Sequence, residues 1–449
     1  MNYTESDNPT HLTILGGGPA GLATAWYARQ KGVRYELYEA SKAFGGNCRT
    51  IRWGEFLLDT GAHRLHDKDP QITEAFRELL GEAMQEVDTP SQICRSGTYF
   101  DFPLSPLDVL GKMGPAEIMR ILWENVYRLG TGGGQANNFR DYAVQRYGPT
   151  LANRFLLNYS EKLWGMPAGR LSPHIAGSRI NRLDFKAFLL EWLGGKRSKN
   201  RHLDGRFYYP KYGIGMLTER LVRELDDSRL HRESKITRLY HKAGRINAIE
   251  FNNQTTLKVN ELVSTLPLPL MIGLLTPEAP EELKKEAGKI RFRNLRLVVI
   301  RLDRDRFTSN ASIYFPDPEV PFTRIYESKN RSAAMAPAGE TAIAVEIPCN
   351  EDSFYYEEAE ERVVDRVKKA LLRHTDIKQE ELLEAAAYRI PMAYPVLEAG
   401  IEPLLGRLRE YLNGFENLQL VGRNARFQYA HLHDMFAMAR RVVRDTISS

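Results

Sequence analysis

The sequence predicts an α/β fold whose central domain is a Rossmann-like parallel sheet assembled from separated segments of the chain. Two observations predict that domain: a strand, a glycine turn and a helix follow one another over residues 11–28, and a further strand and helix follow residue 418. Helical periodicity dominates residues 70–201, and strand-like segments dominate residues 295–347. These two regions predict a helical lobe and an antiparallel-sheet substrate lobe.

The individual elements follow from apolar spacing and from Gly and Pro breaks. Helices are expected over residues 72–80, 115–129, 139–147, 185–193, 355–372 and 434–446. Strands are expected over residues 11–15, 34–38, 51–58, 236–239, 246–251, 261–266, 298–302 and 418–421. The basic run over residues 195–202 is expected to be a solvated loop.

The glycine turn is the most specific feature of the chain. It consists of Gly16, Gly17, Gly18, Pro19, Ala20 and Gly21. In this order Gly16 permits a tight bend, Gly18 lets the backbone approach a pyrophosphate, and Gly21 lets the helix lie close to the sheet. Pro19 and Ala20 begin a helix whose positive dipole end faces the phosphates. The turn therefore predicts a dinucleotide site.

An acidic residue supports this interpretation. The second strand, residues 34–38, is followed by Glu39, at roughly the ~20-residue offset where a carboxylate binds ribose hydroxyls. The alternative is a glycine-rich turn without a ligand, and Glu39 at this spacing argues against it.

Composition limits the remaining choices. Lys and Arg number 62 against 57 Asp and Glu, a small excess that favours an anionic small molecule and is too slight to predict nucleic-acid binding. Three cysteines, without paired or metal-type spacing, suit a reducing compartment. No metal site is predicted, and no apolar run approaches the ~18 residues that span a bilayer. The expected location is the cytoplasm, and peripheral association with a membrane stays open.

The segment after Glu39 narrows the dinucleotide. Ala40 is followed five residues later by the pair Gly45 and Gly46, and then by Asn47. This order resembles the opening of the superfamily of amine oxidases, protoporphyrinogen oxidases and UDP-galactopyranose mutases, in which the second glycine pair lies against the flavin side of the cofactor. The resemblance implies FAD rather than NAD, with these four residues among its contacts.

Further segments resemble UDP-galactopyranose mutases and their bacterial relatives. Residues 59–66 look like the loop whose histidine sits beside the isoalloxazine, which assigns Gly61, Ala62 and His63 to the cofactor and His63 to the reaction. The alternative for His63 is a turn residue that caps the backbone.

Two segments resemble the parts of mutases that bind the substrate diphosphate. Residues 320–329 match the strand whose arginine lies near the flavin, so Arg324 is the corresponding residue. Residues 159–167 and 178–182 match the helical-lobe segment that ends near a second arginine, although the spacing differs by one residue, so Arg182 or Arg179 could supply it. A guanidinium gives phosphate a bidentate contact. The alternative for each is an arginine that faces water.

The end of the chain carries the last resemblance. Residues 422–429 resemble the closing signature of the family, which implies that Gly422 and Arg423 contact the cofactor and that Tyr429 donates to the substrate phosphate. Residues 430–435 depart from it by placing two histidines near an acid. His433 and Asp434 are expected near the pyrimidine end of the flavin, or at the start of the last helix as a cap.

The resemblance divides the chain into five segments. FAD-binding segments are expected at residues 10–69, 202–270 and 415–449, with the helical lobe at 70–201 and the substrate-binding sheet lobe at 271–414.

Three functions are consistent with the resemblance. In the first, reduced-flavin N5 attacks the anomeric carbon of a nucleotide sugar, and Arg324, Tyr429 and one of the two helical-lobe arginines hold the diphosphate. In the second, the flavin takes a hydride from a small organic substrate, as in amine oxidases, protoporphyrinogen oxidases or desaturases. In the third, the protein binds flavin without turnover. NAD(P)H or another flavin reductant is a candidate partner of the first.

Overall fold

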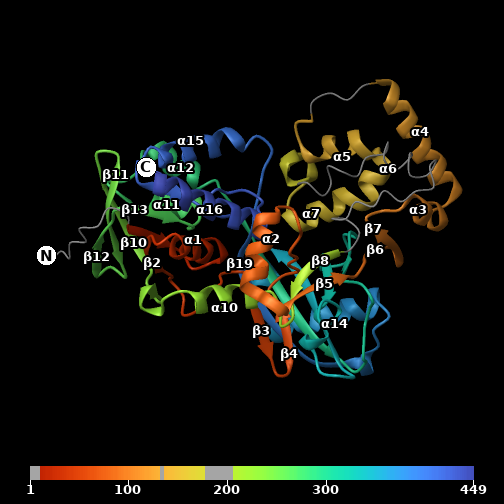
Figure 1. The fold of residues 1–449 in the computed structure, drawn as a ribbon. Coiled ribbons are helices and arrows are strands. Elements are labelled where there is room, and N and C mark those ends of the chain that lie inside the picture. Colours follow the sequence, from red (N-terminus) through yellow and green to blue (C-terminus); the bar gives the residue numbers. More distant parts are fainter. Residues whose placement is uncertain (1–10, 132–135, 177–205, 449) are drawn as a thin grey trace.

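The computed structural model describes residues 11–131, 136–176 and 206–448, and Figure 1 shows how their elements are arranged. One end of the molecule contains a parallel sheet with its helices, and the opposite end contains the helices α3 to α7 (Figure 1). A larger antiparallel sheet lies between and below them. No helix among the described residues has the length and apolar character needed to cross a bilayer.

The parallel sheet has five strands in the order β20-β13-β1-β2-β9. Its strands are β1 (His11–Leu15), β2 (Arg34–Tyr38), β9 (Leu230–His231), β13 (Glu261–Ser264) and β20 (Leu418–Leu420). All four pairings are parallel, and the strands come from three distant regions of the chain. The expected Rossmann-like sheet built from separated segments is therefore confirmed.

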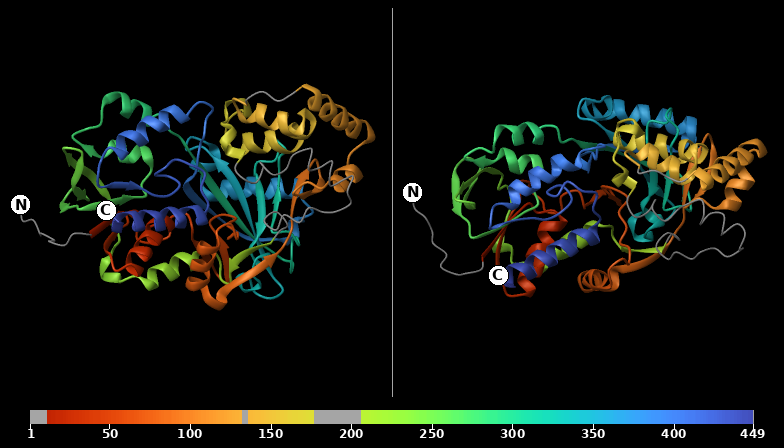
Figure 2. Two further views of the ribbon diagram at one scale, coloured as in Figure 1. Left: turned by 45° about the horizontal axis from the view of Figure 1, so that its top comes forward. Right: turned by 90° about the horizontal axis from the view of Figure 1, so that it is seen from above.

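Helices α1 (Pro19–Gln30) and α16 (Leu432–Ser448) pack together on this sheet. The two views of Figure 2 show them side by side. The turn before α1 is as tight as expected, because a Cβ on Gly21 would lie 1.9 Å from the carbonyl oxygen of Gly16. Gly16 itself has a φ of +95°, which favours glycine.

The larger sheet has seven strands in the order β19-β15-β18-β17-β16-β6-β7. Its strands are β6 (Ser91–Arg95), β7 (Thr98–Phe102), β15 (Phe292–Leu302), β16 (Ser312–Tyr314), β17 (Arg324–Glu327), β18 (Thr341–Cys349) and β19 (Leu382–Pro395). Every pairing is antiparallel except that of β16 with β6. The apolar face of α14 (Glu360–His374) packs on this sheet through Val363, Val367 and Leu371.

The segment 84–102 differs from the expected helical pattern. It forms β5 (Met84–Asp88), β6 and β7; β5 pairs with β8 (Arg206–Pro210), and β6 and β7 extend the seven-stranded sheet. The helical lobe itself begins only with α3 (Pro106–Lys112). Apolar and polar residues alternate only weakly in this short segment. It forms strands because it pairs with segments far away in the sequence.

Two expected elements are each split in the structure. The strand expected over residues 51–58 is a hairpin of β3 (Thr50–Trp53) and β4 (Phe56–Asp59), which turns at Gly54 with a φ of +58°. The helix expected over residues 355–372 is α13 (Phe354–Glu357) followed by α14, because Glu358 and Ala359 are extended.

The remaining elements complete the three regions. The helical lobe contains α4 (Pro115–Thr131), α5 (Phe139–Tyr147), α6 (Pro149–Leu151), a π-helical segment (Ala152–Leu157) and α7 (Asn158–Trp164). A four-stranded sheet contains β10 (Ile236–Lys242), β11 (Arg245–Phe251), β12 (Thr255–Lys258) and β14 (Leu275–Thr276). The other helices are α2 (Pro70–Leu80), α10 (Gly215–Glu224), α11 (Leu268–Gly273), α12 (Glu281–Ala287) and α15 (Glu402–Asn413). The helix expected over residues 185–193 and the basic run lie outside the described residues.

Candidate functional site

A cavity of about 1450 Å³ runs from the glycine turn to the helical lobe. The carboxyl ends of β1, β2, β13 and β20 all contribute to its wall, through Gly16, Glu39, Thr265 and Gly422. This edge of a parallel sheet is where ligands of doubly wound folds bind. The seven-stranded sheet and the helices α6 and α7 provide the other walls.

The glycine turn fits a dinucleotide phosphate. Gly18, Pro19 and Ala20 line the cavity where α1 begins, and no acidic residue lies in the first turn of that helix. A Cβ added to Gly18 would meet no atom within 4 Å, so the space in front of this backbone is free for a ligand. Backbone N–H groups and the positive end of the helix dipole therefore face open space.

Glu39 is held in place by backbone donors. Its Oε2 accepts a hydrogen bond from the Gly17 amide at 2.7 Å, and its Oε1 accepts from the Ser41 amide at 2.8 Å. These bonds tie the carboxylate to the glycine turn and leave it on the cavity wall. This is the position expected for a group that binds a ribose.

The loop after β4 brings His63 to the wall of the cavity. Its Nε2 lies 3.2 Å from the carbonyl oxygen of Asn47. Burial, with a smaller effect from Arg423, lowers the pKa of His63 to about 3, so the ring is neutral. Because a carbonyl only accepts hydrogen bonds, Nε2 carries the proton and Nδ1 is the acceptor. Gly61, Ala62 and Gly46 line the cavity beside it.

Arg324 lies on β17 and forms an ion pair with Glu346 on β18. Arg324 Nε is 2.8 Å from Glu346 Oε2, and Arg324 Nη2 is 2.7 Å from Oε1. Burial opposes the charge of Arg324, but the adjacent carboxylate more than offsets this, so the pKa of Arg324 lies above its ordinary value. Within the described residues, Arg324 Nη1 has no acceptor, and Arg324 lines the cavity.

Glu346 also fixes the histidine loop. Its Oε1 accepts a hydrogen bond from the Ala62 amide at 3.2 Å. One buried carboxylate thus joins Arg324 to the loop that carries His63. The relative position of these two predicted residues therefore depends on Glu346.

Three tyrosine hydroxyls line the same part of the cavity. Tyr159 comes from α7, Tyr394 from β19 and Tyr429 from the segment before α16. Burial raises the pKa of Tyr159 and of Tyr394 well above the ordinary phenol value, so both keep their protons. Among the described residues no hydrogen bond from these three hydroxyls to protein is present.

Lys162 ties helix α7 to the connection between β16 and β17. Its ammonium donates to the carbonyl oxygens of Phe315, Asp317 and Phe322 at 2.6, 2.9 and 2.8 Å. The neighbouring Tyr159 is thereby held over the cavity.

The closing segment divides into residues that line the cavity and residues that do not. Arg423 lines it, and its guanidinium donates to the carbonyl oxygens of Ala430 and Ala393. His433 is instead buried against Phe76 and the carbonyl oxygen of His66. Asp434 accepts a hydrogen bond from the His431 amide at 2.7 Å, as a residue does that caps a helix.

The structure thus brings most of the predicted residues to one cavity. Those on its wall are Gly16, Gly18, Pro19, Ala20, Glu39, Gly46, Asn47, Gly61, Ala62, His63, Arg324, Gly422, Arg423 and Tyr429. Gly21, Ala40, Gly45, His433 and Asp434 are not on the wall. Arg179 and Arg182 lie outside the described residues.

Sequence reasoning missed Glu346, Tyr159 and Tyr394 as site residues. Glu346 could have been recognised, since it is the only charged residue in the mainly apolar strand β18. Tyr159 lies within a segment that resembles the mutases, but nothing in the spacing of the two tyrosines indicates that they share a cavity.

The helical-lobe end of the cavity is mainly apolar. Its wall there is formed by Ile93, Phe102, Leu104, Leu151, Phe155, Leu156, Leu163 and Ile175. A ligand that fills the whole cavity therefore meets polar groups near Arg324 and apolar groups beyond them.

Comparison with solved structures finds the same fold. The crystal structure of reduced UDP-galactopyranose mutase matches with a TM-score of 0.86 and 19% identity, over 98% of this chain and 94% of that chain. Putrescine oxidase bound to putrescine matches with a TM-score of 0.67 and 14% identity, over 98% and 99% of the two chains.

Curated relatives match over shorter stretches. Coproporphyrinogen III oxidase of Bacillus subtilis (strain 168) is 21% identical over 302 residues, which are 60% of this chain and 63% of the relative. L-amino acid oxidase Cdc18 of Crotalus durissus cumanensis is 35% identical over 86 residues, which are 18% of this chain and 17% of the relative. The matches thus span less than two thirds of the length of either relative.

A family model described as flavin-containing amine oxidoreductase matches residues 19–381, most of the chain. The match begins inside the glycine turn and includes β15, β17 and β18 of the seven-stranded sheet. The chain therefore belongs to the family of flavin-containing amine oxidoreductases, and FAD is its cofactor.

Proposed function

We propose that this protein uses reduced FAD to isomerise the sugar ring of a nucleotide sugar. The observation that carries the proposal is a set of polar groups without protein partners among the described residues: Arg324 Nη1 and the hydroxyls of Tyr159, Tyr394 and Tyr429. A diphosphate joined to a sugar offers many acceptor oxygens and suits these donors.

When bound, reduced FAD supplies the electron pair that the anomeric carbon needs while the nucleotide departs and returns. Arg324 binds the diphosphate, and its contact strengthens as negative charge develops on the leaving group. Tyr159 and Tyr394 keep their protons and donate to oxygen atoms, because burial raises the pKa of both. The hydrogen bond to the Asn47 carbonyl oxygen orients the ring of His63. Because this ring is neutral, it adds no charge beside the flavin.

The fold supports the proposal. Reduced UDP-galactopyranose mutase has the same arrangement of lobes over nearly the whole chain. This proposal also includes a second arginine that binds the diphosphate. It includes NAD(P)H as the reductant and the cytoplasm as the location.

A second candidate function is hydride transfer from a small apolar substrate to the flavin. It is favoured by two observations: Glu346 already neutralises Arg324, and the helical-lobe end of the cavity is apolar. In that case FAD accepts the hydride, and the side chains only orient the substrate and exclude water.

One experiment separates the two functions. The yellow holoprotein is reduced with dithionite without oxygen and incubated with UDP-galactopyranose, and the nucleotide sugars are separated by chromatography. We expect a ring isomer to form only with reduced protein, without stoichiometric loss of reductant. Oxygen uptake by the oxidised protein with an organic substrate, and no isomer, would replace the first function by the second.

A matched pair of variants ties the activity to the cavity. Tyr429→Phe removes one of the unpaired hydroxyls, and we expect at least about a tenfold loss of kcat/KM for the isomerisation. Tyr212→Phe changes an exposed tyrosine away from the cavity wall and should leave kcat/KM unchanged.

A further inference from the structure

The exposed face of the helices α3 and α4 is unusually apolar. The large apolar residues Leu107, Met119, Trp123, Val126 and Tyr127 are 62–74% exposed. Other exposed apolar residues of the described chain, such as Tyr212, Leu270, Met392 and Ile447, are scattered. Single exposed apolar side chains need no explanation, but a contiguous group indicates a surface that another phase or molecule covers.

Their spacing places four of these side chains on one side of α4. Met119, Trp123, Val126 and Tyr127 follow one another at intervals of three or four residues. The rings of Trp123 and Tyr127 are stacked, with centroids 5.7 Å apart. The opposite side of α4 is buried in the lobe through Ile121 and Asn125. We call the five exposed apolar residues of α3 and α4 the α3–α4 face.

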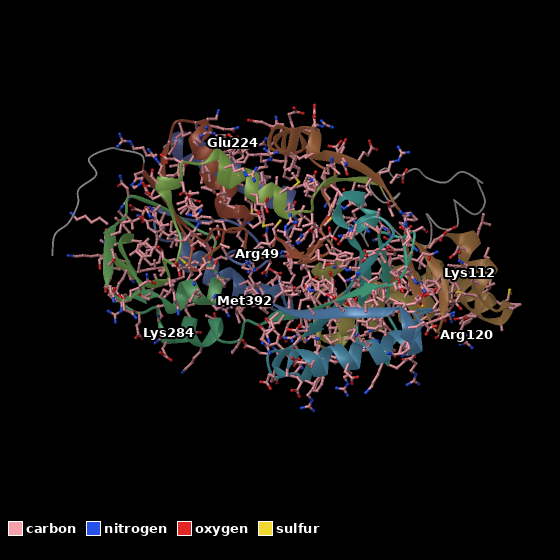
Figure 3. The ribbon with its side chains drawn as sticks, turned by 90° about the horizontal axis from the view of Figure 1, so that it is seen from below. Arg49, Lys112, Arg120, Glu224, Lys284 and Met392 are labelled. Atoms are coloured by element: carbon pink, nitrogen blue, oxygen red, sulfur yellow. The ribbon has the colours of Figure 1, made fainter. Side chains whose placement is uncertain are left out.

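The exposed charged residues beside this face are both basic. Lys112 and Arg120 are exposed, and Figure 3 shows both at the end of the molecule formed by α3 and α4. Arg120 has no partner among the described residues, whereas Lys112 pairs with Asp108.

The three acidic residues of these helices are each engaged by donors of the protein, and Asp108 also pairs with Lys112. Asp108 accepts a hydrogen bond from the Asp101 amide at 2.9 Å, and Glu117 pairs with Arg154 at 2.6 Å. Glu124 accepts from the amide and the hydroxyl of Thr150 at 2.9 and 2.8 Å. No acidic residue of the segment 107–127 is exposed.

We propose that the α3–α4 face binds the surface of a membrane that contains anionic lipids. A helix that presents Trp and Tyr with basic residues and no exposed acid suits the boundary between lipid headgroups and acyl chains. Helix α4 is about 25 Å long at 1.5 Å per residue, and it lies along such a surface without crossing it.

The α3–α4 face lies next to the apolar end of the cavity. Residues 102–105, which line the cavity, lead directly into α3. Bound at a membrane, the protein holds the apolar end of its cavity beside the lipid. The parallel sheet lies at the far end of the molecule and stays in water (Figure 1).

The test is co-sedimentation of the FAD-loaded protein with vesicles. Vesicles of phosphatidylcholine with about 30% phosphatidylglycerol are compared with phosphatidylcholine alone at low and high salt. We expect binding to the anionic vesicles that weakens with salt. The double change Trp123→Ser and Tyr127→Ser should lower the partition coefficient at least about tenfold, and Arg120→Glu should lower it about threefold or more.

Two controls use exposed residues elsewhere in the molecule. Tyr212→Ser removes an exposed aromatic ring, and Arg223→Glu reverses an exposed charge on α10. Neither should change the partition coefficient. The flavin absorbance and the thermal midpoint of every variant show that it is folded.

Three results would overturn the proposal. One is the absence of binding to anionic vesicles at low salt. Another is equal binding by wild-type protein and the double variant. The third is a dimer in sedimentation velocity that the same double change converts to monomer, since the face would then join two copies of the chain.

Discussion

Arg324 and Glu346 lie directly opposite each other on the neighbouring antiparallel strands β17 and β18 and form a two-point ion pair. Glu346 is almost completely buried, and its second contact is the amide of Ala62. The pair therefore serves two purposes at once: it fixes the histidine loop against the sheet, and it presents Arg324 Nη1 to the cavity.

The first prediction concerns Glu346. Glu346→Gln removes the charge that compensates a buried guanidinium, and we expect the free energy of unfolding to fall by about 3–5 kcal/mol. Urea denaturation of the holoprotein measures this. Glu340→Gln is the matched control, since Glu340 pairs with Arg301 at a more exposed position, and it should cost less than about 1 kcal/mol. Equal losses for both variants would contradict the role of burial.

The second prediction isolates the ligand contact of Arg324. Arg324→Ala is made together with Glu346→Gln, so that no uncompensated charge stays buried, and is compared with Glu346→Gln alone. We expect binding of UDP to weaken by about 1.5–3 kcal/mol, or roughly ten- to a hundredfold in Kd. Isothermal titration calorimetry measures Kd. Unchanged affinity would remove Arg324 from the diphosphate site.

The third prediction compares two glycines of the same turn. Gly18→Ala adds a methyl group that meets no protein atom within 4 Å, so the stability of the apoprotein should not change. The methyl group would occupy the space in which a pyrophosphate lies, so FAD affinity should fall at least about tenfold.

Gly21→Ala should act differently. Its methyl group would lie 1.9 Å from the Gly16 carbonyl oxygen, so the turn must move and the apoprotein itself should lose stability. FAD titration and thermal unfolding of both variants separate the two effects. If Gly18→Ala binds FAD as tightly as the wild type, the pyrophosphate does not lie against this turn.

The fourth prediction follows from the pKa of His63. Burial lowers this pKa to about 3, whereas an unfolded histidine has a pKa near 6.5. Between these values the unfolded chain binds a proton that the folded chain does not. His63 therefore makes no difference to the pH dependence above about pH 7, and it lowers the free energy of unfolding as the pH falls below 6.5.

The measurement is urea denaturation at pH 6.5 and pH 5. His63 alone should account for a loss of about 1–2 kcal/mol over this interval, and His63→Gln should remove that part of the slope. His433 contributes with the same sign, because burial lowers its pKa to about 4. His174 is an exposed histidine, and the slope measured for His174→Gln is the control for the loss of a histidine elsewhere in the chain. An unaltered slope in His63→Gln would show that this ring is protonated in the folded protein.

The sequence predicts those parts of the site that short-range rules determine. Gly16, Gly18 and Glu39 are recognisable because a turn, a helix start and a strand end follow one another within 25 residues. The strands β1 and β2 and the helix α5 have the predicted bounds, since their apolar spacing is regular. The loop of His63 and the strand of Arg324 were located by resemblance rather than by spacing.

The sequence does not predict contacts that depend on distant pairing. Glu346 meets Arg324 only because β17 and β18 are paired in this register, and a shift by one residue would turn it to the other face. The sequence predicts helix where strands β6 and β7 form. It carries no signal for their place in the sheet, because β6 pairs with β16, more than two hundred residues further along the chain, and β7 pairs with β6. His433 is expected near the flavin or at the start of the last helix; α16 begins at Leu432, two residues before the predicted start, and His433 packs against Phe76.

The parallel sheet also constrains biosynthesis. Its edge strand β20 and the covering helix α16 come from the last part of the chain, while its central strand β1 lies near the beginning. A nascent chain on the ribosome therefore carries an open-sided β1–β2–β13 layer until residue 420 has emerged. The wall of the coenzyme site that Gly422 and Arg423 provide is thus completed only after β20 has been translated, and until then the open side of the layer is exposed to misassembly.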